Sequence, residues 1–389
     1  MAAPLRPLRS SLLVTRSAAL VALSGAAIAA VNACTIPRLH ARRVTEPVTV
    51  VVPARNEESR IGDLVADLRR QTLLDTLRVI VLDDESADRT AAVATSAFAG
   101  DGRFALVPGD GPPPGWLGKN AACHEGATRA ARLMDPARPG VLVFLDADVR
   151  LAADALAAAV TALRDCGADL VSPWPRQDAA TVTERLIQPL LCWSWFSTLP
   201  VTVANRSTRP STVVACGQFL VFDAAAYYRM GGHAPVAGSH TEDLDIARAV
   251  RSRGGRTVVA AAQERAHCRM YTDADALRDG YTRWLWTAFG SPAGAAVVTT
   301  LVAATYAVPP LAMLFGRGRT RVWGTAGYLA AIASRVTARA VERGSPPSGR
   351  DVADAAAHPV SVAAFVRLVA VSHRDRRRRR LQWKGRQLT

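Results

Sequence analysis

The stretch that decides the fold is Val141-Leu142-Val143-Phe144-Leu145-Asp146-Ala147-Asp148. Its five apolar residues in a row predict a buried strand over 141–145, with two carboxylates at its carboxyl end. Two acids so close cannot both be buried and charged without a partner. Carboxylate oxygens suit Mg²⁺ or Mn²⁺, particularly when a substrate phosphate completes the coordination shell. Asp146 and Asp148 are therefore candidate metal ligands, and a solvated turn whose aspartate caps the next helix is the alternative.

Apolar strands and amphipathic helices alternate on the N-terminal side of this stretch. Residues 48–52 predict a strand that stops at Pro53, and residues 77–82 predict a second one. Helical spacing of apolar residues covers 57–71, and a further helix is expected from Ala87, capped by the serine before it. This order predicts an α/β fold, with a mostly parallel sheet and helices on both of its faces.

In such sheets, ligands bind where the strands end. The acids at these ends are Asp83, Asp84, Asp146 and Asp148. A carboxylate after the 77–82 strand can accept hydrogen bonds from a base edge or a ribose hydroxyl, and a cluster of acids favoured by a helix dipole is the alternative. The turn after the first strand offers further polar groups for a nucleotide pocket, with Pro53, Arg55 and Glu57 as candidates.

Two later segments carry candidate chemistry for the acceptor. Glu242 and Asp243 follow Thr241 and open a helix expected over 244–253. An acid here is a candidate general base if it lies within hydrogen-bond reach of the acceptor, and simple helix capping is the alternative. Arg283 and Trp284 precede an apolar stretch. One reading places them in an interfacial belt at the membrane. In the other, Arg283 stabilises a leaving diphosphate and Trp284 shields the acceptor from solvent.

Apolar segments flank this central region. Residues 17–36 contain no charge and are long enough to span a bilayer. A signal peptide cleaved before Cys34 is the alternative, but cleavage would export the next domain away from nucleotide sugars, so a retained anchor is favoured. We expect an anchor over 1–43, a catalytic domain over 44–290, membrane segments over 291–373 and a basic tail over 374–389.

The C-terminal region contains three apolar stretches, 293–315, 322–340 and 355–371. The Pro309-Pro310 pair suggests that the first stretch dips into the bilayer and returns, while the other two cross out and back. Two crossings with one interfacial helix are the alternative. We expect a multi-pass protein of the plasma membrane with its catalytic domain and tail on the cytoplasmic face, which requires an even number of crossings between them, and both arrangements meet this requirement.

The formal net charge is +15, and much of it lies in the tail, with a run from Arg376 to Arg380. Such a run binds nucleic acid or anionic lipid, or holds a membrane end on the cytoplasmic side. No nucleic-acid-binding signature accompanies it, so we expect a membrane partner and no nucleic acid. The six cysteines are scattered singly, which argues against a disulfide scaffold or a zinc site and is typical of a reducing compartment.

Taken in order, these motifs resemble the family 2 glycosyltransferases, which have the GT-A nucleotide-diphospho-sugar transferase fold. The resemblance covers 48–284 and rests on five segments: Val-Pro-Ala-Arg-Asn-Glu-Glu, Leu-Asp-Asp-Glu-Ser-Ala-Asp-Arg-Thr, Asp-Ala-Asp, Thr-Glu-Asp and Arg-Trp. It implies that Asp84, with Asp83, contacts the nucleotide. It also implies that Asp148, with Asp146, holds a divalent cation bridging the diphosphate. Asp243 would then be the general base of an inverting, single-displacement reaction, with Glu242 beside it.

Arg283 and Trp284 match the end of the family's Gln-x-x-Arg-Trp motif, but Gly280 stands at the position of its glutamine. This departure suggests an acceptor different from the growing polysaccharides of processive members.

A narrower likeness is to the carotenoid- and hopanoid-associated branch, which includes 4,4'-diaponeurosporenoate glycosyltransferases. The segments that carry it are Gly115-Trp116-Leu117-Gly118-Lys119-Asn120, Trp193-Ser194-Trp195-Phe196, Gly231-Gly232-His233 and Trp383-Lys384-Gly385-Arg386. It implies an active-site loop over 112–118 in which Trp116 faces the acceptor or diphosphate. It also makes Lys119 a candidate phosphate contact of the nucleotide sugar, and an ordinary lysine at a helix start is the alternative.

Residues 184–200 are too apolar for a solvated face, so they either lie in the membrane interface or pack in a core. With the resemblance, they predict transfer of a hexose, by default from UDP-glucose with Mn²⁺ or Mg²⁺, to a lipid such as a carotenoid or another polyisoprenoid. The alternatives are a polyprenyl-phosphate sugar synthase and a non-catalytic membrane protein that binds nucleotide sugar.

Overall fold

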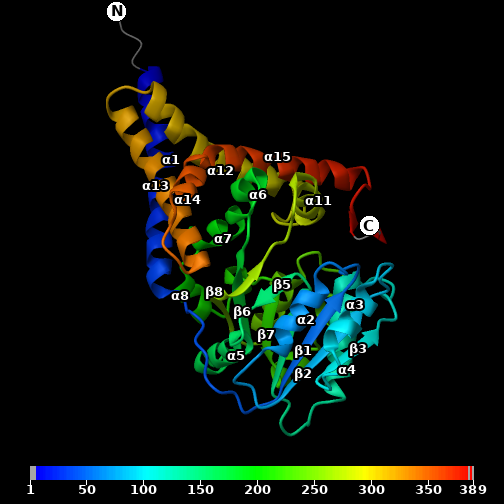
Figure 1. The fold of residues 1–389 in the computed structure, drawn as a ribbon. Coiled ribbons are helices and arrows are strands. Elements are labelled where there is room, and N and C mark those ends of the chain that lie inside the picture. Colours follow the sequence, from blue (N-terminus) through cyan, green and yellow to red (C-terminus); the bar gives the residue numbers. More distant parts are fainter. Residues whose placement is uncertain (1–5, 384–385, 388–389) are drawn as a thin grey trace, which may run out of the picture. The chain divides into compact units, whose positions relative to one another are not determined.

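The computed structural model describes residues 6–383 and 386–387, and it divides into two compact units (Figure 1). The sheet unit comprises Ile36–Asp178 and Val201–Met270, and the helical unit comprises Met1–Thr35, Ala179–Pro200 and Tyr271–Thr389. Residues 179–200 and 271–290, which belong to the expected catalytic domain, group with the terminal helices, and the four expected segments stay a prediction. The Trp383-to-Arg386 motif lies partly outside the described residues, as do the first five residues of the expected anchor.

The sheet unit is built on one mixed sheet of eight strands in the order β3-β2-β1-β4-β7-β6-β8-β5. The strands are β1 (Val48–Ala54), β2 (Leu77–Asp83), β3 (Phe104–Pro108), β4 (Val141–Leu145), β5 (Val149–Leu151), β6 (Leu170–Gln177), β7 (Phe219–Asp223) and β8 (Thr257–Cys268). Strands β1 to β4 are parallel, as predicted, and β6 is parallel to β8. Strand β7 is antiparallel to β4 and β6, and β5 is antiparallel to β8, so the sheet is mixed. A strand buried on both faces has the same continuous apolar pattern whichever way it runs.

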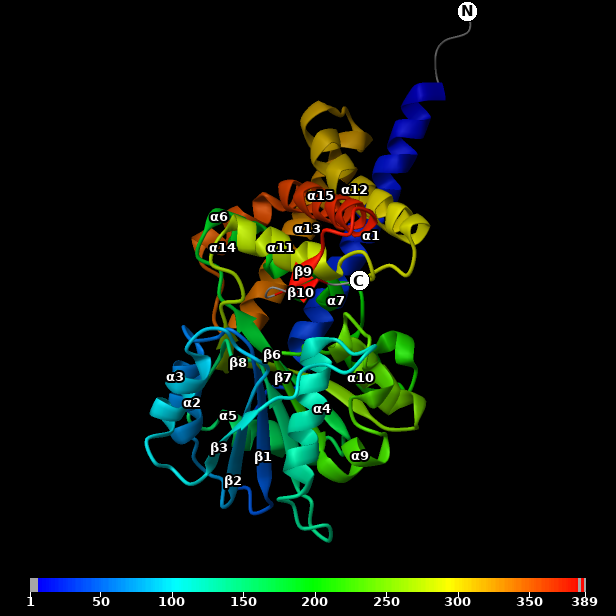
Figure 2. The ribbon, with the colours of Figure 1, turned by 90° about the vertical axis from the view of Figure 1, so that its right-hand side faces the viewer.

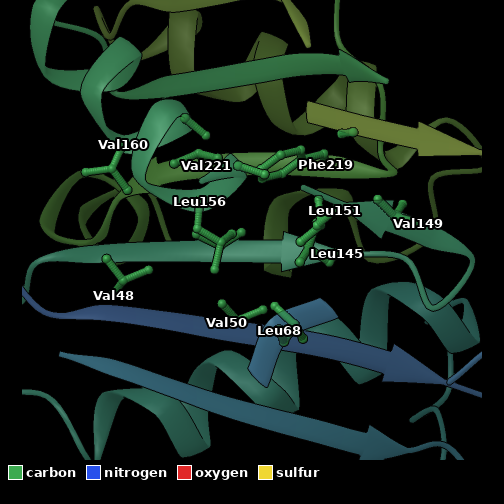
Figure 3. Close-up of a cluster of buried hydrophobic side chains, with 14 of the residues drawn as sticks. Val48, Val50, Leu68, Leu145, Val149, Leu151, Leu156, Val160, Phe219 and Val221 are labelled. Atoms are coloured by element: carbon green, nitrogen blue, oxygen red, sulfur yellow. The ribbon is translucent and has the colours of Figure 1, made fainter. Parts of the chain in front are cut away.

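Helices cover both faces of this sheet, as predicted. One apolar core lies between the strands and three helices, α2 (Ile61–Arg69), α3 (Thr90–Phe98) and α5 (Ala155–Asp165). Figure 3 shows this core, in which Val50 of β1 and Leu145 of β4 meet Leu68 of α2 and Leu156 of α5. The second core faces α4 (Gly118–Ala131), α9 (Ala224–Arg229) and α10 (Glu242–Ser252), which lie together on the other face in Figure 2. A short helix, α8 (Val201–Arg206), completes the unit.

Three predicted element boundaries were wrong. Strand β1 continues through Pro53, which is paired with Leu82 of the neighbouring strand. Helix α2 begins at Ile61 rather than at residue 57. Helix α3 begins at Thr90 rather than Ala87, and Ser86 does not cap it. The residues expected to form the first turns of these two helices do not become helical, because their backbone N–H groups bond to side chains of the other segment. Asn56 and Glu57 donate to Ser86 and Thr90, and Ala87 donates to the side chain of Asn56.

The helical unit contains eight described helices and a two-stranded ladder. They are α1 (Arg6–Thr35), α6 (Val182–Ile187), α7 (Pro189–Phe196), α11 (Ala274–Trp284), α12 (Pro292–Phe315), α13 (Arg319–Arg343), α14 (Gly349–Ala356), α15 (His358–Arg377), β9 (Gln382–Trp383) and β10 (Arg386–Gln387). By length and composition, two helical segments of the described chain are long and apolar enough to cross a membrane, Ser11–Thr35 and Pro292–Phe315. The pair α14 and α15, bent by 59°, makes a third if it is one span.

Helix α12 is continuous through Pro309 and Pro310, so the expected dip and return of this stretch is wrong. Gly324 of α13 lies against this point, where an added Cβ would be 2.7 Å from the carbonyl oxygen of Pro309. Close packing of a neighbouring helix supports the backbone where the prolines cannot donate hydrogen bonds. Helix α13 itself is not among the segments that are long and apolar enough to span a membrane within the described residues.

The apolar stretch 184–200 packs inside the helical unit. Trp193 and Phe196 are buried, and Nε1 of Trp193 donates to Oγ of Ser334 at 2.9 Å. The indole ring also contacts the rings of Tyr306 and His358, with centroids 5.1 and 4.4 Å away. Of the two alternatives, core packing is therefore confirmed for Trp193 and Phe196.

Candidate active site

The turns that follow β1 and β2 are joined by hydrogen bonds and together form one surface, the wall made of residues 53–57 and 83–87. Arg55 donates from its guanidinium to the carbonyl oxygen of Asp84. Asn56 donates its N–H to Oγ of Ser86 at 3.0 Å and accepts the N–H of Ala87 at 2.8 Å. Parallel pairing of the two strands makes this contact possible, because their carboxyl ends reach the same edge of the sheet.

Three predicted nucleotide contacts lie on this wall. Asp84 is buried, and its N–H donates to the carbonyl oxygen of Ala54 at 2.8 Å. Oδ1 of Asp83 accepts the N–H of Ser86 at 3.2 Å, which holds the turn in shape. Glu57 donates its N–H to Oγ1 of Thr90 at 2.7 Å.

Asp146 lies at the end of β4 and forms an ion pair with Lys119. Its N–H donates to the carbonyl oxygen of Gln218 at 3.1 Å, which fixes the backbone after the strand. Nζ of Lys119 lies 2.7 Å from Oδ1 of Asp146. The pair brings the first turn of α4 to the end of β4.

Asp148 has the chemistry of an incomplete cation site. Its Oδ1 is buried without a hydrogen-bond partner, and the nearest cation is Arg60, with Nη1 3.8 Å from Oδ2. Burial, together with the negative charges of Asp146 and Glu57, raises the pKa of Asp148 to about 6. A divalent cation would reverse this penalty, so the residues present fit one. Within the described residues no group of three or more His, Cys, Asp or Glu side chains is arranged to hold a metal, so such a cation would take further ligands from elsewhere.

Asp243 is held by two backbone donors at the start of α10. Its Oδ2 accepts the N–H of Gly217 at 2.9 Å, and its Oδ1 accepts the N–H of Leu244 at 2.8 Å. Burial raises the pKa of Asp243 to about 6, aided by the charge of Glu242 and opposed by Lys119. Thr241 makes no side-chain capping bond, so helix capping by this residue is not observed. A carboxylate with a pKa near neutrality is suited to general-base chemistry.

Lys119 joins the metal-binding candidates to the base candidate. Its Nζ lies 2.9 Å from Oε1 of Glu242 as well as against Asp146. Burial lowers the pKa of Lys119, but the two carboxylates outweigh that effect and hold its pKa well above the ordinary value. Gly217 permits this close approach, because an added Cβ would lie 3.1 Å from Oε1 of Glu242 and 3.3 Å from Nζ of Lys119.

The segment 116–120 is hydrogen-bonded to residues 236–239, which lie just before Glu242. Leu117 donates its N–H to the carbonyl oxygen of Ala237 at 2.9 Å. Nδ2 of Asn120 lies within 3.0 Å of three carbonyl oxygens, those of residues 236, 237 and 239. Trp116 is partly buried, with its ring centroid 4.9 Å from that of His124. These contacts fix the spacing between Lys119 and Glu242.

Arg283 and Trp284 belong to the helical unit, at the end of α11. Trp284 packs near Tyr281, with ring centroids 5.9 Å apart. Gly280 is required here, because an added Cβ would lie 2.2 Å from the ring of Tyr271. With Tyr271 in this position, a glutamine at residue 280 does not fit.

Sequence reasoning missed four residues of this site. Arg60 faces Asp148, Gly217 supports Asp243, and Asn120 holds the 236–239 segment. Gln218 supports the backbone of Asp146, while its side chain donates to Sγ of Cys268 at 3.0 Å. Gly217 and Gln218 directly precede the apolar strand β7, whereas the predicted acids follow their strands; because β7 is antiparallel to β4, its amino end lies beside the carboxyl end of β4.

The chain is similar to known proteins over much of its length. Residues 49–231 match the family described as Glycosyl transferase family 2, and residues 141–340 match Glycosyl transferase family group 2. A 4,4'-diaponeurosporenoate glycosyltransferase of Staphylococcus aureus (strain MRSA252) is 29% identical over 251 residues, which are 62% of each chain. The protein of the same name from Staphylococcus haemolyticus (strain JCSC1435) is 36% identical over 107 residues, 28% of this chain and 25% of that one. The match thus spans less than two thirds of these relatives' length.

Among solved structures, the mannosyltransferase PcManGT from Pyrobaculum calidifontis, in complex with GDP-Man and Mn²⁺, superposes with a TM-score of 0.55. The superposition covers 93% of this chain and 96% of that one at 18% sequence identity, which establishes a shared fold. The family match over 141–340 extends across more than half of the 389 residues. The chain therefore belongs to the family 2 glycosyltransferases.

Proposed function

We propose that this protein is an inverting, metal-dependent glycosyltransferase that moves a hexose from a nucleotide sugar to a lipid acceptor at a membrane. The observation that carries the proposal is the Lys119 bridge, which connects Asp146 with Glu242. Donor activation and acceptor activation need neighbouring groups, because a displacement requires the leaving group and the nucleophile at one carbon.

The donor would bind along the wall formed by the turns after β1 and β2. Asp83 and Asp84 would contact the nucleoside, and the turn of Pro53, Arg55 and Glu57 would line the pocket. Asp146 and Asp148 would hold Mn²⁺ or Mg²⁺, which neutralises charge developing on the leaving diphosphate. The relative with Mn²⁺ and GDP-Man has the same fold, which supports this assignment. UDP-glucose is the donor that the family resemblance suggests.

Asp243 would take the proton of the acceptor. The acceptor oxygen forms a bond to the anomeric carbon as the bond from that carbon to the diphosphate oxygen breaks, which inverts the configuration. The N–H groups of Gly217 and Leu244 aim the carboxylate, and the nearby charge of Glu242 keeps its basicity high. Lys119 would hold Glu242 and Asp146 in place while the diphosphate leaves.

The acceptor is proposed to be a carotenoid or another polyisoprenoid. Two relatives bear the name 4,4'-diaponeurosporenoate glycosyltransferase, and two helical segments are long and apolar enough to cross a membrane. Membrane anchorage would keep the enzyme beside an insoluble acceptor, for which Trp116 of the active-site loop is a proposed contact. The catalytic domain would lie on the cytoplasmic face of a multi-pass plasma-membrane protein, where nucleotide sugars are made.

The test uses the full chain reconstituted in bilayers with native lipid extract. A panel of nucleotide sugars is supplied with Mn²⁺ or Mg²⁺, and glycolipid products are identified by mass while nucleoside diphosphate release is measured. A new glycosylated polyisoprenoid with inverted configuration is the expected product. A sugar found only on added polyprenyl phosphate would assign the acceptor as a phosphate instead. No glycolipid and no diphosphate release with any donor would exclude the proposal.

A further inference from the structure

A strongly basic pocket of about 340 Å³ lies within the helical unit. Its lining residues come from α11, α15 and the segment after α15: Arg278, Asp279, Arg367, Val371, Arg374, Asp375 and Arg380. Four arginines against two aspartates leave two positive charges on the lining. The two helices are joined at this point, because Oγ of Ser372 donates to the carbonyl oxygen of Thr282 and accepts the N–H of Trp286.

The aspartates of the pocket are already paired with neighbours. Arg278 donates from Nε and Nη2 to Oδ1 of Asp279 at 3.1 and 3.0 Å. Nε of Arg374 donates to Oδ1 of Asp375 at 3.0 Å. Within the described residues, Arg367 and Arg380 have no carboxylate within 4.0 Å. These two exposed guanidinium groups are therefore available to an anion that enters the pocket.

Phosphate oxygens match this demand. Guanidinium groups form short, charge-assisted and often bidentate hydrogen bonds with phosphate. A pocket lined by several of them surrounds a tetrahedral anion, and the single apolar lining residue, Val371, offers little to a neutral ligand. The proposed sugar-transfer site lies on other residues and does not enter this inference.

The surroundings of the pocket favour a lipid as the source of the phosphate. The pair α14 and α15 is apolar enough to be a membrane span, and the pocket lies at the charged end of α15. The guanidinium carbon of Arg376 lies 3.3 Å from the ring centroid of Trp286, and tryptophan is enriched at membrane interfaces. The run from Arg376 to Arg380 adds the positive charge that draws a protein to anionic lipid. We propose that this pocket binds the headgroup phosphate of an anionic phospholipid.

The test measures lipid binding to the full chain in detergent, by native mass spectrometry with phosphatidylglycerol. Arg367→Gln combined with Arg380→Gln removes the two unpaired guanidinium groups. We expect this variant to bind phosphatidylglycerol about tenfold more weakly, as the loss of charged hydrogen bonds implies. The matched control, Arg377→Gln with Arg378→Gln, removes the same charge from exposed tail residues outside the pocket and should change the affinity less than about twofold.

Three further arms separate the sources of the signal. Arg367→Lys with Arg380→Lys keeps the positive charge but loses the planar guanidinium group, so it should also weaken binding. An unchanged thermal unfolding midpoint shows that each variant folds. Zwitterionic phosphatidylcholine should bind weakly to every form. Equal losses in the pocket and control variants would overturn the proposal in favour of diffuse tail charge. Inorganic phosphate that displaces the lipid and needs the same arginines would reassign the pocket to a soluble phosphate.

Discussion

Lys119 and Glu242 form an ion pair across the candidate active site, with Nζ 2.9 Å from Oε1. The same ammonium lies 2.7 Å from Oδ1 of Asp146, which we propose as a metal ligand. A single positive charge therefore stabilises two carboxylates with different proposed roles. The consequence is a competition, because a cation bound to Asp146 and the ammonium of Lys119 attract the same oxygens.

Replacing Lys119 with Met tests this competition. We expect turnover to fall about 100-fold, because a positioned positive charge near the leaving group is lost. Binding of Mn²⁺ without nucleotide should become tighter, since the ammonium no longer neutralises Asp146. Electron paramagnetic resonance of free Mn²⁺ measures the second effect. Arg129→Met, at a half-buried position on the same helix whose guanidinium pairs with Glu125 instead, is the control and should alter neither quantity. Unchanged turnover and unchanged Mn²⁺ affinity would leave Lys119 with no part in the site.

Asp243→Asn tests the proposed base. With a hydroxyl acceptor the rate of transfer should fall by about 10²–10⁴, the usual contribution of a general base. With a carboxylic-acid acceptor, whose ordinary pKa is near ~4, the loss should be much smaller because the acceptor is already ionised. Transfer to both acceptor types is measured in reconstituted bilayers. The control is Asp245→Asn on the same helix, whose carboxylate accepts from Ser239 and Arg248 instead. A large loss in the control as well would point to damage of α10 rather than to a missing base.

The pH dependence of kcat/KM should show the titration of Asp243. The charges that face this carboxylate are Glu242 beside it and Lys119 on α4. The nearby thiol of Cys216 stays neutral, because burial raises its pKa above the ordinary value. Because the base works only when deprotonated and its pKa is raised to about 6, kcat/KM should fall with decreasing pH below about 6 and level off above it. The limb should disappear in Asp243→Asn. A limb that persists in that variant belongs to another group.

The ends of strands could be predicted from the sequence, and with them most acids of the site. Asp84 and Asp146 follow continuous apolar runs, so their place at one edge of the sheet follows from parallel pairing. The direction of β7 could not be predicted, since its apolar pattern is the same either way. The Lys119 bridge could not be predicted either, because it depends on the contact between α4 and the 236–239 segment before α10, which Asn120 makes through hydrogen bonds.

Predictions from neighbouring residues alone failed where a contact from a distant part of the chain bonded the same backbone or side-chain group. Ser86 has the residue type and position of an N-cap, but its hydroxyl accepts the N–H of Asn56 from the adjacent turn. Pro53 was expected to end β1, yet it continues in the strand paired with Leu82. Neither outcome is determined by neighbours in sequence, because each depends on a partner about thirty positions away.

Asp148→Asn should abolish transfer and yet stabilise the protein in a chelator. Folding raises the pKa of Asp148 to about 6, so its ionisation at neutral pH opposes folding, and a neutral amide relieves that penalty. We expect the thermal midpoint at pH 7.5 with EDTA to rise by about 2–6 °C. Addition of Mn²⁺ with nucleoside diphosphate should stabilise the wild type and leave the variant unchanged. Equal stabilisation of both forms would show that the cation binds elsewhere.

Gly280→Gln restores the residue of the family motif and tests why it is absent. Its Cβ would lie 2.2 Å from the ring of Tyr271, so the helical unit must shift or lose packing. We expect the free energy of unfolding to fall by about 1–3 kcal/mol, as for other overpacked sites. Tyr271→Ala removes the obstructing ring, so the double variant should be less destabilised than the sum of the two single changes. Thermal midpoints of the four proteins in one detergent give this coupling. Additive effects would show that Tyr271 does not exclude the glutamine, and the acceptor motif would then have lost it for a reason other than steric conflict.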